Sequence, residues 1–223
     1  MEPRERASAD ARENRPVHPI EWLYRDDTVL AVDKPAGLLS VPGRGEAKSD
    51  CLAARVQASV PDALVVHRLD QATSGVMLFG RGAPAQRVLS IAFAERRVAK
   101  RYEAVVHGDV AGEEGLIDLP LRGDWPNRPR QMVDHGHGKP ALTRWRVLSR
   151  DARAGTTRLA LDPVTGRSHQ LRVHLAEIGH AIVGDALYAP FVEAPRLLLH
   201  ACELRLPHPG DGRTLTVTSP LPF

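Results

Sequence analysis

Short apolar or alternating segments separated by turns recur along this chain, whereas only two stretches have the spacing of a helix. Strands are expected at residues 29–32, 63–66, 76–79, 102–106, 116–121, 143–147, 158–161, 196–206 and 214–218. One helix is expected at residues 85–96, and a second is expected to begin with Ser168 as its cap and to end at Gly179. This order predicts a single α+β domain with a large mixed, mainly antiparallel sheet flanked by helices.

The second helix has one clear apolar face. Leu171, His174, Leu175 and Ile178 recur at helical spacing and are expected to face the core. Arg172 lies beside this stripe, so its side chain can reach a cleft at the start of the helix. The positive end of a helix also favours a carboxylate or a phosphate at this place.

The composition is that of a soluble globular protein, with 223 residues of which 43% are hydrophobic and 26% charged. No apolar run approaches the ~18 residues that a membrane span requires, so the protein is not expected to interact with a membrane. Cys51 and Cys202 have neither metal-ligand spacing nor the pattern of a disulfide framework, which favours a cytoplasmic location. Residues 1–16 alternate arginine with acidic residues and are expected to form a disordered charged leader before a catalytic domain at residues 17–223.

The net charge of +3 resides in the predicted domain, because four acidic residues cancel four arginines in residues 1–16. Basic residues gather in two groups: Arg96, Arg97, Lys100 and Arg101, and then Arg122, Arg128 and Arg130. Such groups favour a nucleic acid over an acidic small molecule as the binding partner. A genomic bias toward arginine codons would raise the total number of arginines equally well. Aromatic residues amount to only 4%, which argues against a base-stacking platform.

The polar stretch HRLDQATSG, residues 67–75, lies between two of the apolar runs. A carboxylate between histidine and arginine, in a loop held by two rigid strands, is typical of a catalytic loop. The alternative is a structural turn in which Asp70 binds its own backbone. A partly buried Asp70 would need a cationic partner, and an arginine at ~4 Å would supply roughly 4 kcal/mol at an effective dielectric near 20.

Several other kinds of site are disfavoured. His169, His174 and His180 are five and six residues apart, so one helical face cannot present all three to a metal, and His174 is expected to be a core histidine. No nucleophile elbow, phosphate-binding glycine loop or dinucleotide fingerprint occurs, and no cofactor is expected. A hydrolase that pairs Asp70 with His67 is a weaker alternative, because no oxyanion arrangement is evident.

Three segments together resemble the RluA-type pseudouridine synthases. They are HRLDQATSG at 67–75, KRYEA at 100–104 and GRSHQLRVHL at 166–175, and DKPAGL at 33–38 and GHAIVGD at 179–185 match further blocks of the family. The resemblance covers residues 22–223 in the family's order. DLPL at 118–121 is similar to the short, dual-specificity branch, which lacks an N-terminal S4 domain. The resemblance implies an enzyme that isomerises specific uridines in folded RNA without a cofactor.

The resemblance also implies roles for single residues. Asp70 would be the nucleophile, and attack on the base or on the sugar would equally need it ionised. Arg172 would keep Asp70 charged, and Tyr102 would stack on the flipped base and could move a proton, although from its strand alone it reads as a core residue. The substrate-binding residues would be Arg68, which fills the gap left by the flipped uridine, Leu171, His67, Arg128 and Arg130.

The implied substrate is large-subunit ribosomal RNA, the anticodon stem-loop of tRNA, or both. The protein would thus act in rRNA or tRNA processing, as a monomer that binds a structured RNA and no small-molecule cofactor. The alternative is a non-catalytic RNA-binding or ribosome-assembly factor with the same fold. An intact set of Asp70, Tyr102 and Arg172 argues against it, because binding alone does not need these three residues.

Overall fold

A computed structural model describes residues 19–43, 49–190 and 194–223, so the predicted leader at residues 1–16 lies outside the described part. Within it, ten strands form one sheet: β1 (Glu21–Arg25), β2 (Val29–Lys34), β3 (Ala63–Val65), β4 (Ser74–Arg81), β5 (Ala99–His107), β6 (Glu114–Asp118), β9 (Leu142–Asp151), β10 (Thr156–Pro163), β11 (Leu199–Pro207) and β12 (Thr214–Thr218). β7 (Leu121–Gly123) and β8 (Gln131–Val133) form a separate hairpin. The helices are α1 (Leu52–Ser59), α2 (Gly82–Ala94) and α3 (Gln170–Glu177).

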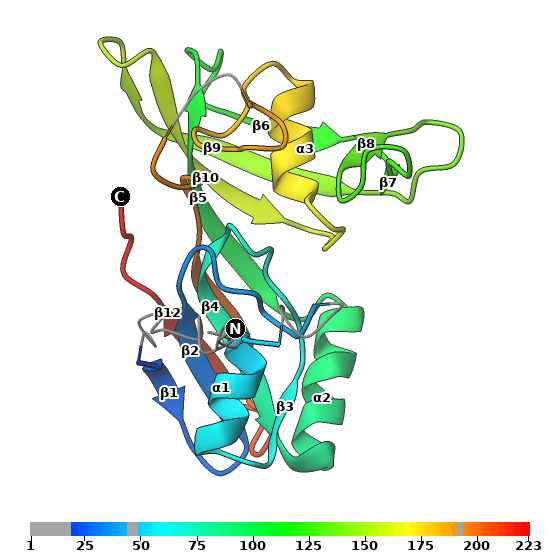
Figure 1. Cartoon of the computed structure of the whole chain (residues 1–223), viewed down its shortest axis with the longest axis vertical. Coiled ribbons are helices and arrows are strands. Elements are labelled where there is room, and N and C mark those ends of the chain that lie inside the picture. Colours follow the sequence, from blue (N-terminus) through cyan, green and yellow to red (C-terminus); the bar gives the residue numbers. More distant parts are fainter. Residues whose placement is uncertain (1–18, 44–48, 191–193) are drawn as a thin grey trace, which may run out of the picture.

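The sheet is mixed and mainly antiparallel, as predicted. Its strand order is β1-β2-β4-β11-β5-β10-β9-β6, with β3 added to β4 and β12 added to β11, and among the described strands β4 and β11 are the parallel pair. Figure 1 shows two parts joined by β5 and β11: α1 and α2 lie with β1 to β4 in one part, and α3 and the β7–β8 hairpin lie with β6, β9 and β10 in the other.

The core of the first part follows from the alternation of apolar residues in β4. Leu78 packs with Leu89 of α2, whereas its neighbour Phe79 points to the other face and packs with Val56 of α1. All four side chains are fully buried, and each burial is worth about 1.5–3 kcal/mol. Because a helix covers each face, β4 reads as a continuous apolar run in the sequence.

The start of α3 differs from the prediction. Ser168 does not cap the helix; His169 occupies the cap position with a left-handed φ of 53° and makes no side-chain cap hydrogen bond. The preceding turn is held by Gln170 instead, whose side-chain oxygen accepts hydrogen bonds from the Thr165 hydroxyl at 2.7 Å and the Arg167 N–H at 3.0 Å. These contacts are made by the first residue of the helix, so the capping signal of serine has no effect here.

Most of the predicted core face of α3 is confirmed. Leu171, His174 and Leu175 are buried, and the ring of His174 contacts the Thr143 hydroxyl and the Leu119 carbonyl, each at 3.0 Å. Ile178 was expected in the core but is 37% exposed, because α3 ends at Glu177 and the chain turns away.

The remaining differences concern element boundaries. Residues 116–121 do not form one strand: β6 ends at Asp118, and β7 begins after the proline at 120. β11 begins at Leu199 and not at 196, and β1, β8 and α1 have no counterpart among the predicted elements. No helix of the described residues is long and apolar enough to cross a membrane.

Candidate active site

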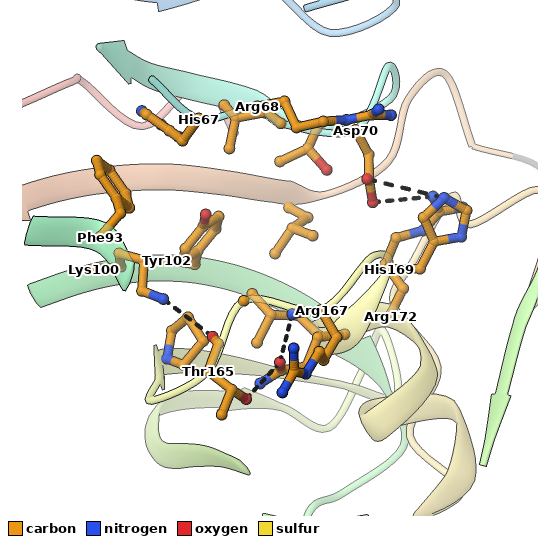
Figure 2. A pocket seen from close by; sticks show the side chains of 17 residues that line it. His67, Arg68, Asp70, Phe93, Lys100, Tyr102, Thr165, Arg167, His169 and Arg172 are labelled. Carbon is orange, nitrogen blue, oxygen red and sulfur yellow. Dashed lines mark hydrogen bonds and ion pairs between the residues drawn. The ribbon is translucent and has the colours of Figure 1, made fainter. Parts of the chain in front are cut away.

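A pocket of about 310 Å³ brings together the three segments that the sequence analysis selected. It is lined by the loop after β3, the beginning of β5 and the turn that leads into α3 (Figure 2). The lining residues are His67, Arg68, Leu69, Asp70, Thr73, Phe93, Lys100, Tyr102, Pro163, Thr165, Gly166, Arg167, His169, Gln170, Leu171, Arg172 and Leu199. Its volume lies at the lower end of the range for small-ligand pockets.

The loop that carries Asp70 is fixed from behind by two buried polar side chains. The Ser40 hydroxyl donates to the Leu69 carbonyl at 2.6 Å and accepts the Leu69 N–H at 3.1 Å. The Lys34 ammonium donates to three carbonyls at 2.7–3.0 Å, those of Pro35, Leu38 and Gln71. Both neighbours of Asp70 are therefore held in place, and the loop presents its carboxylate in a defined position.

Lys34 is completely buried, and its three carbonyl acceptors match the three protons of an ammonium group. Burial lowers its pKa to about 7, although the nearby Asp70 and Asp33 carboxylates raise it. The residue thus places a positive charge, or a neutral amine at higher pH, directly behind the loop of Asp70.

Each oxygen of the Asp70 carboxylate faces a different nitrogen. Oδ2 lies 3.5 Å from Nη1 of Arg172, and Oδ1 lies 3.9 Å from Nε2 of His169 (Figure 2). The side chain of Asp70 is 19% exposed, so it can be reached from the pocket. The structural-turn alternative predicts only local contacts for Asp70, and these two long-range contacts go beyond it.

Arg172 is shared between two carboxylates. Its Nε and Nη2 each donate to Asp185 at 2.7 Å, and Nη1 is left to face Asp70. Burial lowers the pKa of Arg172, but the hydrogen bonds and charge of Asp185 outweigh it and leave that pKa above its ordinary value. The guanidinium is therefore permanently charged and rigidly oriented beside Asp70.

Tyr102 and Leu171 supply the apolar part of the pocket. Tyr102 comes from β5 and points into the pocket between Asp70 and Phe93 (Figure 2). Burial, followed by the negative charge of Asp70, raises the pKa of its hydroxyl, so the phenol stays protonated. Leu171 is buried in the first turn of α3.

His67 lines the pocket but is occupied as a structural residue. Its Nε2 accepts the Leu78 N–H at 2.9 Å, and its ring stacks on Phe93 with the centroids 4.6 Å apart. Burial, together with the charge of Lys100, lowers the pKa of His67 to about 3. A ring in this state cannot act as the base of an Asp70–His67 hydrolase, which argues against that alternative.

Several side chains of the two basic groups already have partners within the protein, so fewer of them are available to bind RNA than the sequence indicates. In the first group, Arg97 pairs with Glu95, Arg101 pairs with Asp162, and Lys100 donates to the Thr165 carbonyl. In the second group, Arg122 pairs with Asp134, whereas Arg128 and Arg130 are exposed in the β7–β8 loop and lie over the rings of Trp125 and Tyr188. Arg68 is also exposed, at the pocket itself.

The comparisons with known proteins agree with this geometry. The family model described as RNA pseudouridylate synthase matches residues 28–177, a segment that contains Asp70, Tyr102 and Arg172. The chain belongs to this family. It is 48% identical to the dual-specificity RNA pseudouridine synthase RluA of Escherichia coli K12 over 214 residues, which cover 94% of this chain and 97% of that protein. The corresponding protein of Yersinia pestis is 51% identical over 193 residues, covering 85% of this chain and 93% of the relative.

The solved structures give the same result. Human RNA pseudouridylate synthase domain containing 1 superposes with a TM-score of 0.79 at 30% identity, covering 95% of this chain and 87% of the human one. Human RNA pseudouridylate synthase domain containing 4 shares the fold with a TM-score of 0.72 at 24% identity. The protein is an RNA pseudouridine synthase with a single-domain fold of the family's kind.

Three residues that contact Asp70, Arg172 or His169 carried no functional prediction. Asp185 and Tyr188 lie beyond the matched segment, and His169 was considered only as a metal ligand. GHAIVGD contains Asp185, but no spacing rule places this carboxylate against a side chain of α3. Among the described residues no group of three histidine, cysteine or acidic side chains could hold a metal ion.

Proposed function

We propose that Asp70 is the nucleophile with which this synthase isomerises uridine. The observation that carries the proposal is the ion-pair geometry: a pocket carboxylate lies 3.5 Å from a buried arginine that a second carboxylate fixes in place. Uracil is released from the ribose, turned and rejoined through carbon, which needs an ionised carboxylate and no oxidant or reductant. Arg172 supplies the positive charge that faces the Asp70 carboxylate, and the loop held by Lys34 and Ser40 keeps that carboxylate oriented.

The target uridine is proposed to enter the pocket by flipping out of the RNA stem. Tyr102 stacks on the uracil and can move a proton, and Leu171 packs against the same base. Arg68, exposed at the pocket, fills the gap that the uridine leaves, while His67 shapes the pocket from behind. Flipping costs a few kcal/mol, which contacts to the flanking RNA must offset.

The phosphate contacts are assigned to Arg128 and Arg130. Both are exposed in the loop between β7 and β8, on the side of the molecule that carries α3 (Figure 1). Arginine binds phosphate through its planar fork, so two such side chains can fix a stem-loop without reading its sequence.

The substrate is proposed to be large-subunit ribosomal RNA, the anticodon stem-loop of tRNA, or both, modified in the cytoplasm by a monomer. Support comes from the relatives, which are named dual-specificity RNA pseudouridine synthases and which this chain matches over 85–94% of its length. Mapping pseudouridines in RNA from cells with and without the gene identifies the modified positions. Loss of sites in only one RNA class would restrict the proposal to that class.

The catalytic assignment is tested by tritium release from RNA labelled at carbon 5 of uridine. Wild type is expected to release tritium, and Asp70→Asn is expected to release none while binding the same RNA, because the amide keeps the shape but cannot attack. Equal release by Asp70→Asn would remove Asp70 from its role. RNA binding without release by the wild type would favour a non-catalytic RNA-binding or ribosome-assembly factor.

A further inference from the structure

His169 has an unusual place in the fold. It is a non-glycine residue with a left-handed backbone, directly before α3, and its side chain forms no cap hydrogen bond. Such a conformation is uncommon, costs of order 1–3 kcal/mol, and persists only where the surrounding structure holds it. The His169 side chain contacts Tyr188 and Asp70 instead of capping the helix.

The hydroxyl of Tyr188 favours one tautomer of His169. This oxygen accepts the Gln131 N–H at 2.8 Å, so its own proton is available for Nδ1 of His169 at 2.9 Å. Nε2 then carries the ring proton and faces Oδ1 of Asp70 at 3.9 Å. The two neighbours of the ring, one a donor and the other an acceptor, select the same tautomer.

Electrostatics agree with a neutral ring. Burial lowers the pKa of His169 below its usual range, although the Asp70 carboxylate opposes this and the nearby Arg172 adds to it. A neutral ring with its proton on Nε2 can orient a carboxylate oxygen without neutralising the charge that attack requires. The distance of 3.9 Å is longer than a hydrogen bond, and contacts of this kind tighten when substrate closes the site.

We infer that His169 is a positioning residue for Asp70, and that Tyr188 fixes the tautomer in which it acts. This inference rests on the proposed role of Asp70 as nucleophile. Arg172 and His169 would each hold one carboxylate oxygen, so that the attacking atom has a single orientation.

Tyr188 also connects the site with the exposed hairpin. Gln131, whose N–H it binds, is the first residue of β8, and the guanidinium of Arg130 lies 5.3 Å from the centre of the Tyr188 ring. RNA that binds Arg130 would therefore contact a side chain that lies over the Tyr188 ring. Arg172 lies on the same ring at 5.2 Å, so both arginines restrict where the phenol can lie.

The test compares single-turnover rates at saturating RNA with RNA affinity, using a tritiated transcript that the wild type modifies. His169→Met and Tyr188→Phe are each expected to slow the reaction roughly 10- to 100-fold with unchanged affinity. His169→Gln is expected to recover most of the rate, because its amide N–H can reach Asp70. Tyr24→Phe removes a hydroxyl that binds Asp26, and neither residue lines the pocket, so this variant should have the rate and the RNA affinity of the wild type.

A double variant separates the inference from a general loss of structure. If Tyr188 acts through His169, the His169→Met/Tyr188→Phe enzyme should be as slow as His169→Met alone. Wild-type rates in both single variants, with Asp70→Asn inactive, would overturn the inference and leave the proposed function standing. Multiplying effects in the double variant would also overturn it. An active Asp70→Asn enzyme would instead overturn the proposed function itself.

Discussion

Asp185 holds Arg172 by two hydrogen bonds of 2.7 Å, and both side chains are almost completely withdrawn from solvent. The same carboxylate accepts the N–H groups of Leu187 and Tyr188, so it also orders the turn that carries Tyr188. Asp185 thus connects two parts of the site, although it does not line the pocket.

Asp185→Asn should destabilise the protein by about 3 kcal/mol, because a buried guanidinium loses its charged partner. Urea denaturation followed by circular dichroism measures this change. Asp27→Asn is the matched control: its side chain is fully exposed, so solvent screens its ion pair with Arg81 and the substitution should have a much smaller effect. An equal effect of the two substitutions would contradict the role assigned to Asp185.

Arg172→Met should lower turnover by about 100-fold or more while changing RNA affinity little, because the charge beside Asp70 is lost. Tritium release and filter binding measure the two quantities. Arg172→Lys keeps a charge but cannot form the paired hydrogen bonds to Asp185, so an intermediate rate is expected. Near-normal turnover of Arg172→Met would show that the reaction does not depend on the positive charge beside Asp70.

His67 should make the fold sensitive to acid. Its pKa in the folded protein is about 3, below the ordinary value of 6.5, so between these values the unfolded chain binds a proton that the folded chain does not. Stability should therefore fall as the pH decreases from about 6.5 toward 3. His67→Gln keeps an acceptor for the Leu78 N–H without titrating, and its stability should fall less between pH 7 and 5 in urea denaturation. Equal losses in both proteins would contradict this assignment.

Gly75 should tolerate no side chain. A Cβ there would lie 2.3 Å from the Ala201 carbonyl oxygen, where β4 meets β11, and φ is +117°. Gly75→Ala should cost about 3 kcal/mol or more in the free energy of unfolding. Gly37 also has a positive φ, but a Cβ there meets no atom within 4 Å, so Gly37→Ala should cost only about 1 kcal/mol. Similar costs would show that backbone conformation alone, and not the approach of β11, requires glycine at 75.

The loop between β7 and β8 should contribute to RNA affinity through charge. Arg128→Ala and Arg130→Ala should each weaken binding and reduce the slope of log affinity against log salt by about one unit per lost phosphate contact. Arg122→Ala is the comparison, because its ion pair with Asp134 leaves it less available to phosphate. An unchanged slope in both loop variants would place the RNA surface elsewhere.

The sequence by itself determined the mixed sheet, the helices α2 and α3 and the residues that carry the family's motifs. These depend on local periodicity and on short patterns, as in β4, where alternating apolar residues serve two faces. It did not determine the start of α3, because Gln170 and Thr165 override the capping signal of Ser168. The sequence also identified the loop of Asp70, because a histidine and an arginine precede this carboxylate between two apolar runs.

Only the tertiary structure decided what holds these residues. The contact of Arg172 with Asp185 joins a helix to a turn 13 residues away, and Lys34 reaches the carbonyl of Gln71 across 37 residues. Neither contact has a periodic or compositional signal, because hydrogen bonds between distant segments depend on where the sheet places them. For the same reason the contacts of the His169 ring with Tyr188 and Asp70 became apparent only in the folded chain.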